Sequence, residues 1–218
     1  MRNLSSSLLF NIPVSLVVAY LLGSIPSAVW FSKLFAGIDI RDEGSKNAGL
    51  TNTFRVLGWK PALPVVFLDL GKGVLAPYIA IQLSEGSSAS SWLPMAAGFV
   101  AILGHSFTCM AGFRGGKGVL TALGVFLCLA WFEALIAFVV WLTITLVTRY
   151  VSLASILACF ALSISLGLSY FLNQNISNLL LLITGVLVTF FVTFKHKANI
   201  QRLLNGTENR FGSKKKEV

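Results

Sequence analysis

The chain has 218 residues, of which 56% are apolar and only 11% are charged, and its mean hydropathy is +0.80. Water-soluble globular proteins do not carry repeated apolar runs close to the ~20 residues that span a bilayer, so this composition excludes that class and predicts a membrane protein. The formal net charge of +9 would suggest a nucleic acid partner for a soluble protein, but in a membrane protein the positions of the charges decide their meaning.

Apolar runs recur along the chain and predict an all-α, polytopic integral membrane bundle. No linker or low-complexity run divides them, so we predict a single transmembrane domain over residues 1–218. The N-terminal run imitates a signal peptide but lacks a small-residue cleavage pattern, so we expect it to remain as the first span. The predicted spans lie at about 8–34, 61–83, 92–110, 119–131, 134–148, 153–172 and 178–194.

The stretch 119–147 decides the predicted topology. It is apolar over about 30 residues apart from Glu133, and it fits either one long tilted helix or two short helices that meet near Trp131. Two helices make seven spans, although each then has only about 13 to 15 residues, which is short for a full span. Seven spans place the segments 33–60, 111–118, 149–152 and 195–218 on one side. We therefore predict seven transmembrane helices, with the N terminus outside and the C terminus cytoplasmic.

Basic residues gather on the predicted inner side. Of the 17 Lys and Arg residues, only Arg2 and Lys72 fall outside the inner segments, which is the bias typical of cytoplasmic loops. The lysines at 214–216 are expected to anchor the tail on membrane lipids. Lys72 follows Asp69 by one helical turn inside a span, where we expect the two charges to neutralise each other. We predict no nucleic acid partner.

Three polar, glycine-rich clusters interrupt the apolar chain, at 44–55, 104–121 and 196–208. They bring backbone N–H groups, hydroxyls and cations together, a combination that suits anionic oxygen and phosphate above all. The first cluster carries Ser45, Asn47, Thr51, Asn52 and Arg55. A helix opening near Thr51 would add its N-terminal dipole to the site. The alternative is a loop that merely caps this helix.

The second cluster contains a glycine-rich loop that leads into an apolar helix, with the sequence Arg114-Gly115-Gly116-Lys117-Gly118. Its backbone can form an anion-binding nest, with Lys117 and Arg114 as cations. The loop is not a Walker A sequence, because Ala111 stands at the first required glycine and Gly118 stands where Ser or Thr should hold magnesium. His105, near the start of the cluster, is by itself more typical of a hydrogen-bonded structural histidine.

In the third cluster, His196, Asn199 and Arg202 are spaced three residues apart, so on a helix they share one face at the inner end of the last span. They could converge on one ligand. The alternative is an amphipathic interfacial helix on which Lys195 and Lys197 are solvated.

Other familiar reactive patterns are missing from the sequence. Cys109, Cys128 and Cys159 form no CxxC pair, which gives no support to a metal site or a disulfide framework. The chain has no GxSxG, HExxH or Hx4D sequence and no dense acidic cluster, which argues against a serine acyl-enzyme and a metal hydrolase. We predict neither a metal nor a cofactor.

The three clusters, in this order and spacing, resemble those of the bacterial acyl-phosphate:glycerol-3-phosphate acyltransferases of the PlsY type, which are integral membrane enzymes of phospholipid synthesis. The likeness covers nearly the whole chain and is carried by segments 23–26, 44–52, 68–73, 104–118 and 196–208. Thr108 stands where the family usually has proline, while Lys46 and Ala48 replace the commoner glycine and proline of the first cluster. We expect these departures to change loop stiffness more than chemistry.

The resemblance implies transfer of a fatty acyl group from acyl phosphate to the sn-1 hydroxyl of glycerol 3-phosphate, giving 1-acyl-sn-glycerol 3-phosphate (lysophosphatidic acid). It implies that neither acyl-CoA nor acyl carrier protein is the direct donor. It further implies a monomer in the bacterial cytoplasmic (inner) membrane, with the active site on the cytoplasmic face.

By position, the resemblance assigns catalysis to His196, Lys117 and Asn199. Substrate and phosphate contacts are predicted for Ser45, Asn47, Thr51, Asn52, Arg55, Arg114, Gly115, Gly116, Lys117, Gly118, Ser155 and Asn199. Ser155 is preferred over Ser152 as the ligand-contacting serine of its segment. Either His196 or a substrate phosphate oxygen accepts the hydroxyl proton.

Two other classes compete with an enzyme. A transporter for a phosphorylated small anion would also use cationic, glycine-rich loops, but here the cations lie on one predicted face instead of near the midplane, and no inverted repeat is visible. A noncatalytic membrane scaffold would not need Arg55, Lys117 and Asn199 together.

Overall fold

The computed structural model describes residues 4–212, so Arg2 and the predicted lipid anchor at 214–216 lie outside the described residues. Within that range the chain is helical and contains no strand, which confirms the all-α prediction. The helices are α1 (Leu4–Gly23), α2 (Ser27–Ala36), α3 (Leu50–Leu57), α4 (Trp59–Ser84), α5 (Leu93–Ser106), α6 (Val119–Leu129), α7 (Trp131–Thr148), α8 (Val151–Asn173), α9 (Ile176–Lys195) and α10 (Lys197–Leu204), with short 3-10 turns η1 (Ser88–Ser91) and η2 (Cys109–Ala111).

Over residues 4–212, six segments are long and apolar enough to cross a membrane. They are Asn11–Ala36, Trp59–Ser84, Leu93–Ala111, Trp131–Thr148, Val151–Asn173 and Ile176–Lys195. The predicted span 119–131 forms α6, which has only 11 residues and falls below that length. The two-helix interpretation of 119–147 is confirmed, because α6 and α7 are separate helices on either side of Ala130.

The first predicted span, 8–34, is not one continuous helix, because α1 ends at Gly23 and α2 begins at Ser27. Pro26 lacks a backbone N–H and cannot continue the hydrogen-bond ladder of α1. The freed carbonyls find partners on other segments: Thr108 donates its hydroxyl to the Ser24 carbonyl, and Lys72 donates to the Ile25 carbonyl at 2.8 Å. Neighbouring side chains of this kind make a broken helix tolerable inside a membrane.

The expected pairing of Asp69 with Lys72 is confirmed. Their charged atoms lie 2.8 Å apart, and both side chains are buried within the bundle.

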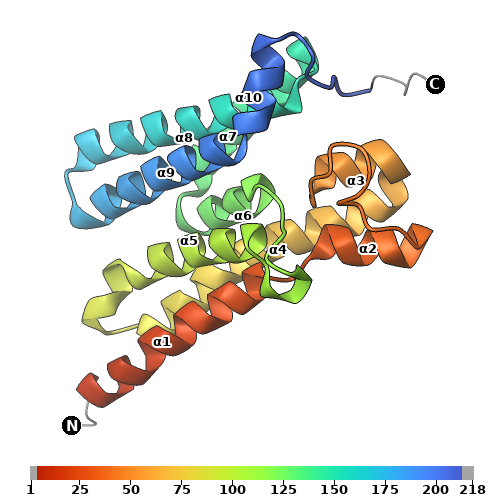
Figure 1. Cartoon of the computed structure of the whole chain (residues 1–218). Coiled ribbons are helices and arrows are strands. Elements are labelled where there is room, and N and C mark those ends of the chain that lie inside the picture. The colour runs from red at the N-terminus through yellow and green to blue at the C-terminus, as the bar shows by residue number, and fades with distance from the viewer. Residues whose placement is uncertain (1–3, 213–218) are drawn as a thin grey trace.

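The helices form two groups around α6. In Figure 1, α7, α8, α9 and α10 lie on one side of α6, and α1, α2, α3 and α4 lie on the other. Helices α4 and α6 approach closely because glycines face each other, and a methyl group at Gly124 would stand 3.0 Å from the Gly73 Cα atom. Small residues permit such close backbone contact between membrane helices.

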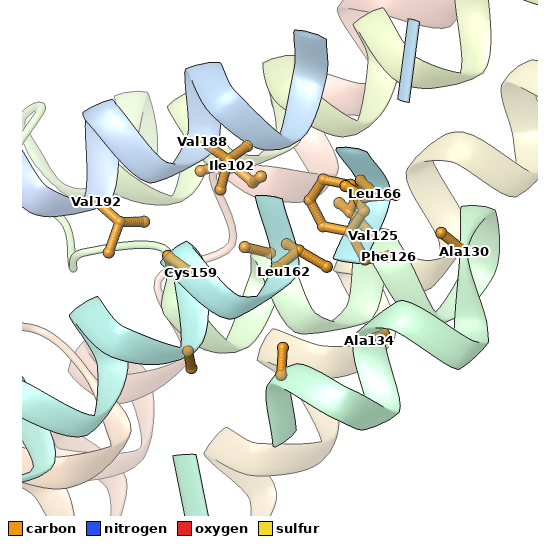
Figure 2. Close-up of a cluster of buried hydrophobic side chains, with 13 residues drawn as sticks. Ile102, Val125, Phe126, Ala130, Ala134, Cys159, Leu162, Leu166, Val188 and Val192 are labelled. Atoms are coloured by element: carbon orange, nitrogen blue, oxygen red, sulfur yellow. The ribbon is translucent and has the colours of Figure 1, made fainter. Parts of the chain in front are cut away.

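The larger hydrophobic core joins α5 and α6 to α7, α8 and α9. Figure 2 shows Ile102 of α5 and Phe126 of α6 in one cluster with Leu162 of α8 and Val188 of α9. This packing holds α6, whose N terminus follows the glycine-rich loop, between the two groups.

The segments that carry the three polar clusters lie toward one end of the bundle. Figure 1 shows α2, α3 and α10 at the end opposite the N terminus of α1. The common location predicted from the charge distribution is therefore compatible with the helical arrangement.

Candidate active site

A cavity of about 360 Å³ opens between the two groups of helices, and all three polar clusters contribute to its wall. The polar part of the wall comprises Ser45, Asn47, Thr51, Asn52, Arg55, Asp69, His105, Lys117, Ser152, Ser155, His196, Asn199, Arg202, Glu208 and Asn209. The apolar part comes mainly from α6, α7 and α8 and includes Val119, Leu123, Phe126, Ala134, Ala137, Phe138, Trp141, Ala158 and Leu162. One cavity thus combines a polar region, which carries the cations Arg55, Lys117 and Arg202, with an aliphatic and aromatic one.

Lys117 is the cation that the glycine-rich loop brings to this cavity. Its Nζ atom donates a hydrogen bond to the Oδ1 atom of Asn199. Burial lowers the pKa of Lys117 to about 8; the nearby carboxylate of Glu208 opposes this shift, and the positive charges of Arg202 and Arg55 add to it. The ammonium is therefore held in a setting that favours a negatively charged ligand.

Glu208 accepts hydrogen bonds from two residues of the third cluster and from one residue of α8. Its carboxylate accepts hydrogen bonds from Asn199 Nδ2 at 2.6 Å, from Ser152 Oγ at 2.8 Å and from Arg202 Nε at 2.7 Å. These donors hold the pKa of Glu208 below its usual value despite the opposing effect of burial. The Asn199 amide is fixed by this contact, with its oxygen left to face Lys117.

His196 is buried at the junction between α9 and α10. Its Nδ1 atom lies 2.8 Å from the Val192 carbonyl, and because a carbonyl can only accept, Nδ1 carries the hydrogen. Burial, followed by the charge of Lys117, lowers the pKa of His196 to about 4. The ring is therefore neutral near pH 7, and Nε2 carries a free lone pair.

The two serines of α8 differ in their partners. Ser155, which the sequence analysis preferred, donates to the Val151 carbonyl of its own helix at 2.8 Å. Ser152 instead donates to Glu208, so it belongs to the hydrogen-bond network that orients Asn199. Both serines line the cavity.

In the first cluster, helix α3 begins at Leu50, one residue before the predicted start. The buried Asn52 supports the loop with its side chain: Oδ1 accepts from the Ser45 N–H at 2.8 Å, and Nδ2 donates to the carbonyls of Ile40 and Glu43. The hydrogen-bonding groups of its amide are thus largely used by contacts within the protein, although Asn52 lines the cavity. Arg55, in the last turn of α3, is partly buried at the cavity wall, and burial lowers its pKa.

Lys46 adopts a positive φ of 58°, a conformation that favours glycine.

Not every residue of the second cluster reaches the cavity. Lys117 and Gly118 line it, whereas Arg114 is exposed and Gly115 and Gly116 lie behind the wall. Gly118 has a φ of 81°, which lets the chain turn sharply into α6. The structure therefore brings together most of the predicted binding residues but not Arg114, Gly115 and Gly116.

Arg41 joins the first two clusters outside the cavity. Its guanidinium bonds Asp39 through Nε at 2.9 Å and Nη2 at 2.7 Å, and Nη1 donates to the Ala111 carbonyl at 2.6 Å. The hydrogen bond from Arg41 is the main reason that the pKa of Asp39 falls to about 2. The ion pair fixes the Arg41 side chain, and its hydrogen bond to the Ala111 carbonyl holds the loop before the first cluster against the segment that precedes Arg114.

Sequence reasoning did not select Glu208, Asp69 or His105 as site residues, yet all three line the cavity. Glu208 is the last residue of the third cluster, and that position was its only sequence signal. Among residues 4–212, no group of three or more His, Cys, Asp or Glu side chains is arranged to hold a metal ion.

The fold and the cavity define a class, namely a multi-pass integral membrane protein with one cavity that has a polar region carrying three cations and an adjoining apolar region. Residues 13–206 match the sequence model of the glycerol-3-phosphate acyltransferase family. The chain belongs to this family.

Relatives in several bacteria are similar over nearly their full length. The glycerol-3-phosphate acyltransferase of Fusobacterium nucleatum is 45% identical over 90% of this chain and 96% of the relative. That of Chlorobium phaeobacteroides (strain BS1) is 41% identical over 93% of this chain and 97% of the relative.

Two solved structures of the same family have a similar fold. The crystal structure of PlsY, an integral membrane glycerol 3-phosphate acyltransferase, in its glycerol 3-phosphate form is 38% identical, with a TM-score of 0.82 over 92% of this chain and 96% of the other. Its lysophosphatidic acid form has a TM-score of 0.80 at the same identity, over 92% of this chain and 95% of the other.

Proposed function

We propose that the protein transfers a fatty acyl group from acyl phosphate to the sn-1 hydroxyl of glycerol 3-phosphate, with 1-acyl-sn-glycerol 3-phosphate and inorganic phosphate as products. Membership of the glycerol-3-phosphate acyltransferase family supports the acceptor and the type of reaction. The observation that carries the proposal is one cavity in which a region that holds three cations adjoins an apolar region. Two phosphate-bearing reactants with one fatty chain require such a combination.

The polar region supplies the groups that two phosphates need. Arg55 offers a planar guanidinium fork, and Lys117 offers an ammonium that its surroundings have partly desolvated. Ser45 and Asn47 add neutral donors on the same wall. Charge-assisted hydrogen bonds to phosphate are strongest where water is excluded, so the partial burial of Lys117 favours binding of an anion.

The apolar region suits a fatty chain. Ala134 and Ala137 of α7 face the cavity with small side chains, and Phe126 and Leu162 border the same space. An acyl chain placed there would leave its phosphate head beside the cations. The donor would then approach from the bilayer, while glycerol 3-phosphate arrives from water.

The transfer requires no covalent enzyme intermediate. The sn-1 hydroxyl oxygen attacks the acyl carbonyl carbon, the bond from that carbon to the phosphate oxygen breaks, and phosphate leaves with the electron pair. Because phosphate is a good leaving group, positioning and stabilisation of negative charge can supply most of the catalysis. Lys117 is the candidate for the second task, and Asn199 holds its ammonium in place.

The hydroxyl proton has two available acceptors. Nε2 of His196 is neutral and free because Nδ1 donates to Val192. A substrate phosphate oxygen is the other acceptor.

We also propose that the whole chain acts as one domain and as a monomer in the bacterial inner membrane, with seven spans, the N terminus outside and the active site on the cytoplasmic face. The basic residues on the inner segments support this orientation. In this arrangement α6, with 11 residues, crosses only within the bundle, between α4 and α7.

The decisive assay uses purified protein in detergent, palmitoyl phosphate and labelled glycerol 3-phosphate, with acyl-CoA and acyl carrier protein tested as separate donors. We expect labelled lysophosphatidic acid from palmitoyl phosphate alone, with the acyl group at sn-1 by NMR. Product from acyl-CoA but not from acyl phosphate would contradict the donor. Uptake of glycerol 3-phosphate into proteoliposomes without any covalent change would instead favour the transporter.

A further inference from the structure

Three buried polar side chains with no role in the proposed transfer surround one carboxylate oxygen of the buried Asp69 inside the bundle. Asp69 Oδ1 accepts a hydrogen bond of 2.6 Å from the Ser27 hydroxyl and lies 2.8 Å from Lys72 Nζ. Nδ1 of His105 lies 3.6 Å from the same oxygen. All four side chains are buried, so this network links α2, α4 and α5 out of contact with bulk water.

His105 connects the network to the glycine-rich loop. The backbone carbonyl of His105 accepts a hydrogen bond from the Gly116 N–H at 3.2 Å, and the Ser106 carbonyl accepts one from the Gly115 N–H at 3.2 Å. A methyl group at Gly116 would overlap Nε2 of the His105 ring, and one at Gly115 would overlap the His105 carbonyl. Gly115 and Gly116 of the loop therefore pack directly against His105, and Lys117 is the residue that follows them.

A role in stability alone does not account for this arrangement. Removing charges from water is costly, and a buried ion pair seldom stabilises a protein more than well-packed apolar side chains do. Ionisable groups inside a membrane protein are accordingly uncommon and tend to mark function. Asp69 and His105 also line the cavity, so the network reaches the site as well as the loop.

We propose that Asp69 and His105 are positioning residues for Lys117. The carboxylate of Asp69 fixes the imidazole ring, and the ring and backbone of His105 fix the loop that presents the ammonium to a substrate phosphate. Lys72 balances the charge of Asp69 and ties the network to the break between α1 and α2 through the Ile25 carbonyl. This inference rests on the proposed function, because it takes Lys117 to meet a substrate anion.

The first test is His105→Asn. Asparagine keeps a donor on the side of Asp69 and leaves the ion pair with Lys72 intact, but it removes the ring that lies beneath Gly116. We expect kcat to fall by roughly tenfold or more, because the ammonium is no longer held in register with the developing charge. The thermal midpoint in detergent should stay close to that of the wild type.

A second variant removes both charges together. Asp69→Asn combined with Lys72→Met leaves no unpaired charge inside the bundle, but it also removes the donor to the Ile25 carbonyl, so we expect a thermal midpoint somewhat below that of the wild type. The imidazole of His105 nevertheless loses its carboxylate partner. We expect the same loss of kcat as in His105→Asn.

Gly116→Ala approaches the contact from the loop side and removes no side chain of the network. Its methyl group would overlap the His105 ring and the Ala48 carbonyl oxygen, so the loop must shift and this variant should also lose kcat.

The matched control is a polar pair outside the cavity, formed by the buried Thr189 and the half-buried Ser163. Thr189 Oγ1 lies 2.8 Å from Ser163 Oγ and donates to the Cys159 carbonyl at 2.8 Å, between α8 and α9. Thr189→Val should lower the thermal midpoint and leave kcat unchanged, because this pair does not touch the loop.

Wild-type kcat in His105→Asn or in the charge-free double variant would overturn the inference. An equal loss of kcat in Thr189→Val at a similar fall in thermal midpoint would also overturn it, because the loss would then follow from stability alone. The proposed donor is judged separately, by wild-type turnover with acyl phosphate. The positioning role is tested by the ratio of the variant's kcat to the wild-type kcat, measured with whichever acyl donor the wild type accepts.

Discussion

The ammonium of Lys117 donates a hydrogen bond to the amide oxygen of Asn199, a residue 82 positions further along the chain. Asn199 cannot turn its amide away, because its nitrogen donates to Glu208 at 2.6 Å. The glycine-rich loop and the helix after the last span are thereby joined at one charged group. The orientation of the Lys117 ammonium is therefore already set before a ligand phosphate enters the cavity.

Removal of the Lys117 charge should impair transfer strongly. We expect Lys117→Ala to lose at least ~2 kcal/mol of transition-state stabilisation, which is about a 30-fold decrease in kcat/KM. Steady-state kinetics with both substrates measures this loss. Lys197→Ala, at an exposed lysine outside the cavity, is the control and should keep wild-type kinetics. An unimpaired Lys117→Ala enzyme would remove this residue from the site.

The alkaline limb of the pH profile should belong to Lys117. Burial lowers its pKa to about 8, so the free enzyme loses the ammonium as pH rises through that value. We expect kcat/KM to decline above about pH 8, and we expect Lys117→Arg to abolish the decline because a guanidinium stays charged. The overall rate of this variant can be lower without affecting the test. An identical alkaline decline in both enzymes would assign it to another group.

His196→Gln separates the two proton acceptors. The pKa of His196 is lowered to about 4, so the ring is neutral above that pH and becomes protonated only as pH falls through it. If Nε2 is the base, His196→Gln should lose roughly 10²-fold or more of kcat across pH 5 to 8. Retained transfer with an unchanged pH dependence would leave the substrate phosphate as the acceptor.

Loss of the Glu208 charge should weaken both the structure and the activity. Glu208→Gln leaves Arg202 without its anionic partner and disturbs the donors Asn199 and Ser152. We expect a cost of about 1–3 kcal/mol in stability, seen as a lower thermal midpoint in detergent, together with reduced kcat. The exposed Glu43, changed to Gln, is the control. Equal midpoints for the two variants would speak against a tethering role.

Cysteine labelling in intact cells tests the topology. In a version without Cys109, Cys128 and Cys159, single cysteines replace the exposed residues Asp42, Lys197 and Glu85. We expect a membrane-impermeant reagent added outside to label position 85 only, with positions 42 and 197 reacting after permeabilisation. Positions 42 and 197 on opposite sides of the bilayer would be incompatible with a shared cavity.

Much of the fold could be predicted from local signals. The apolar runs predicted every long helix, and the interruption of one run near Trp131 and Glu133 predicted the division into α6 and α7, which lies at Ala130. The break before Ser27 was missed, because the apolar pattern continues past Pro26. Whether a proline interrupts a membrane helix depends on partners for the freed carbonyls, and these partners are Thr108 and Lys72, far along the chain.

The candidate site was also predictable only in part. Sequence alone determined that this is a membrane protein of helices, with three cationic, glycine-rich segments assigned to one face, because hydropathy, charge and glycine content are properties of short stretches. Only the tertiary structure decided that Asn52 is occupied within its own loop, that Arg114 stays outside the cavity, and that Glu208 orients Asn199. The reason is physical: a polar side chain is available to a ligand only if the segments folded around it leave its hydrogen bonds unused.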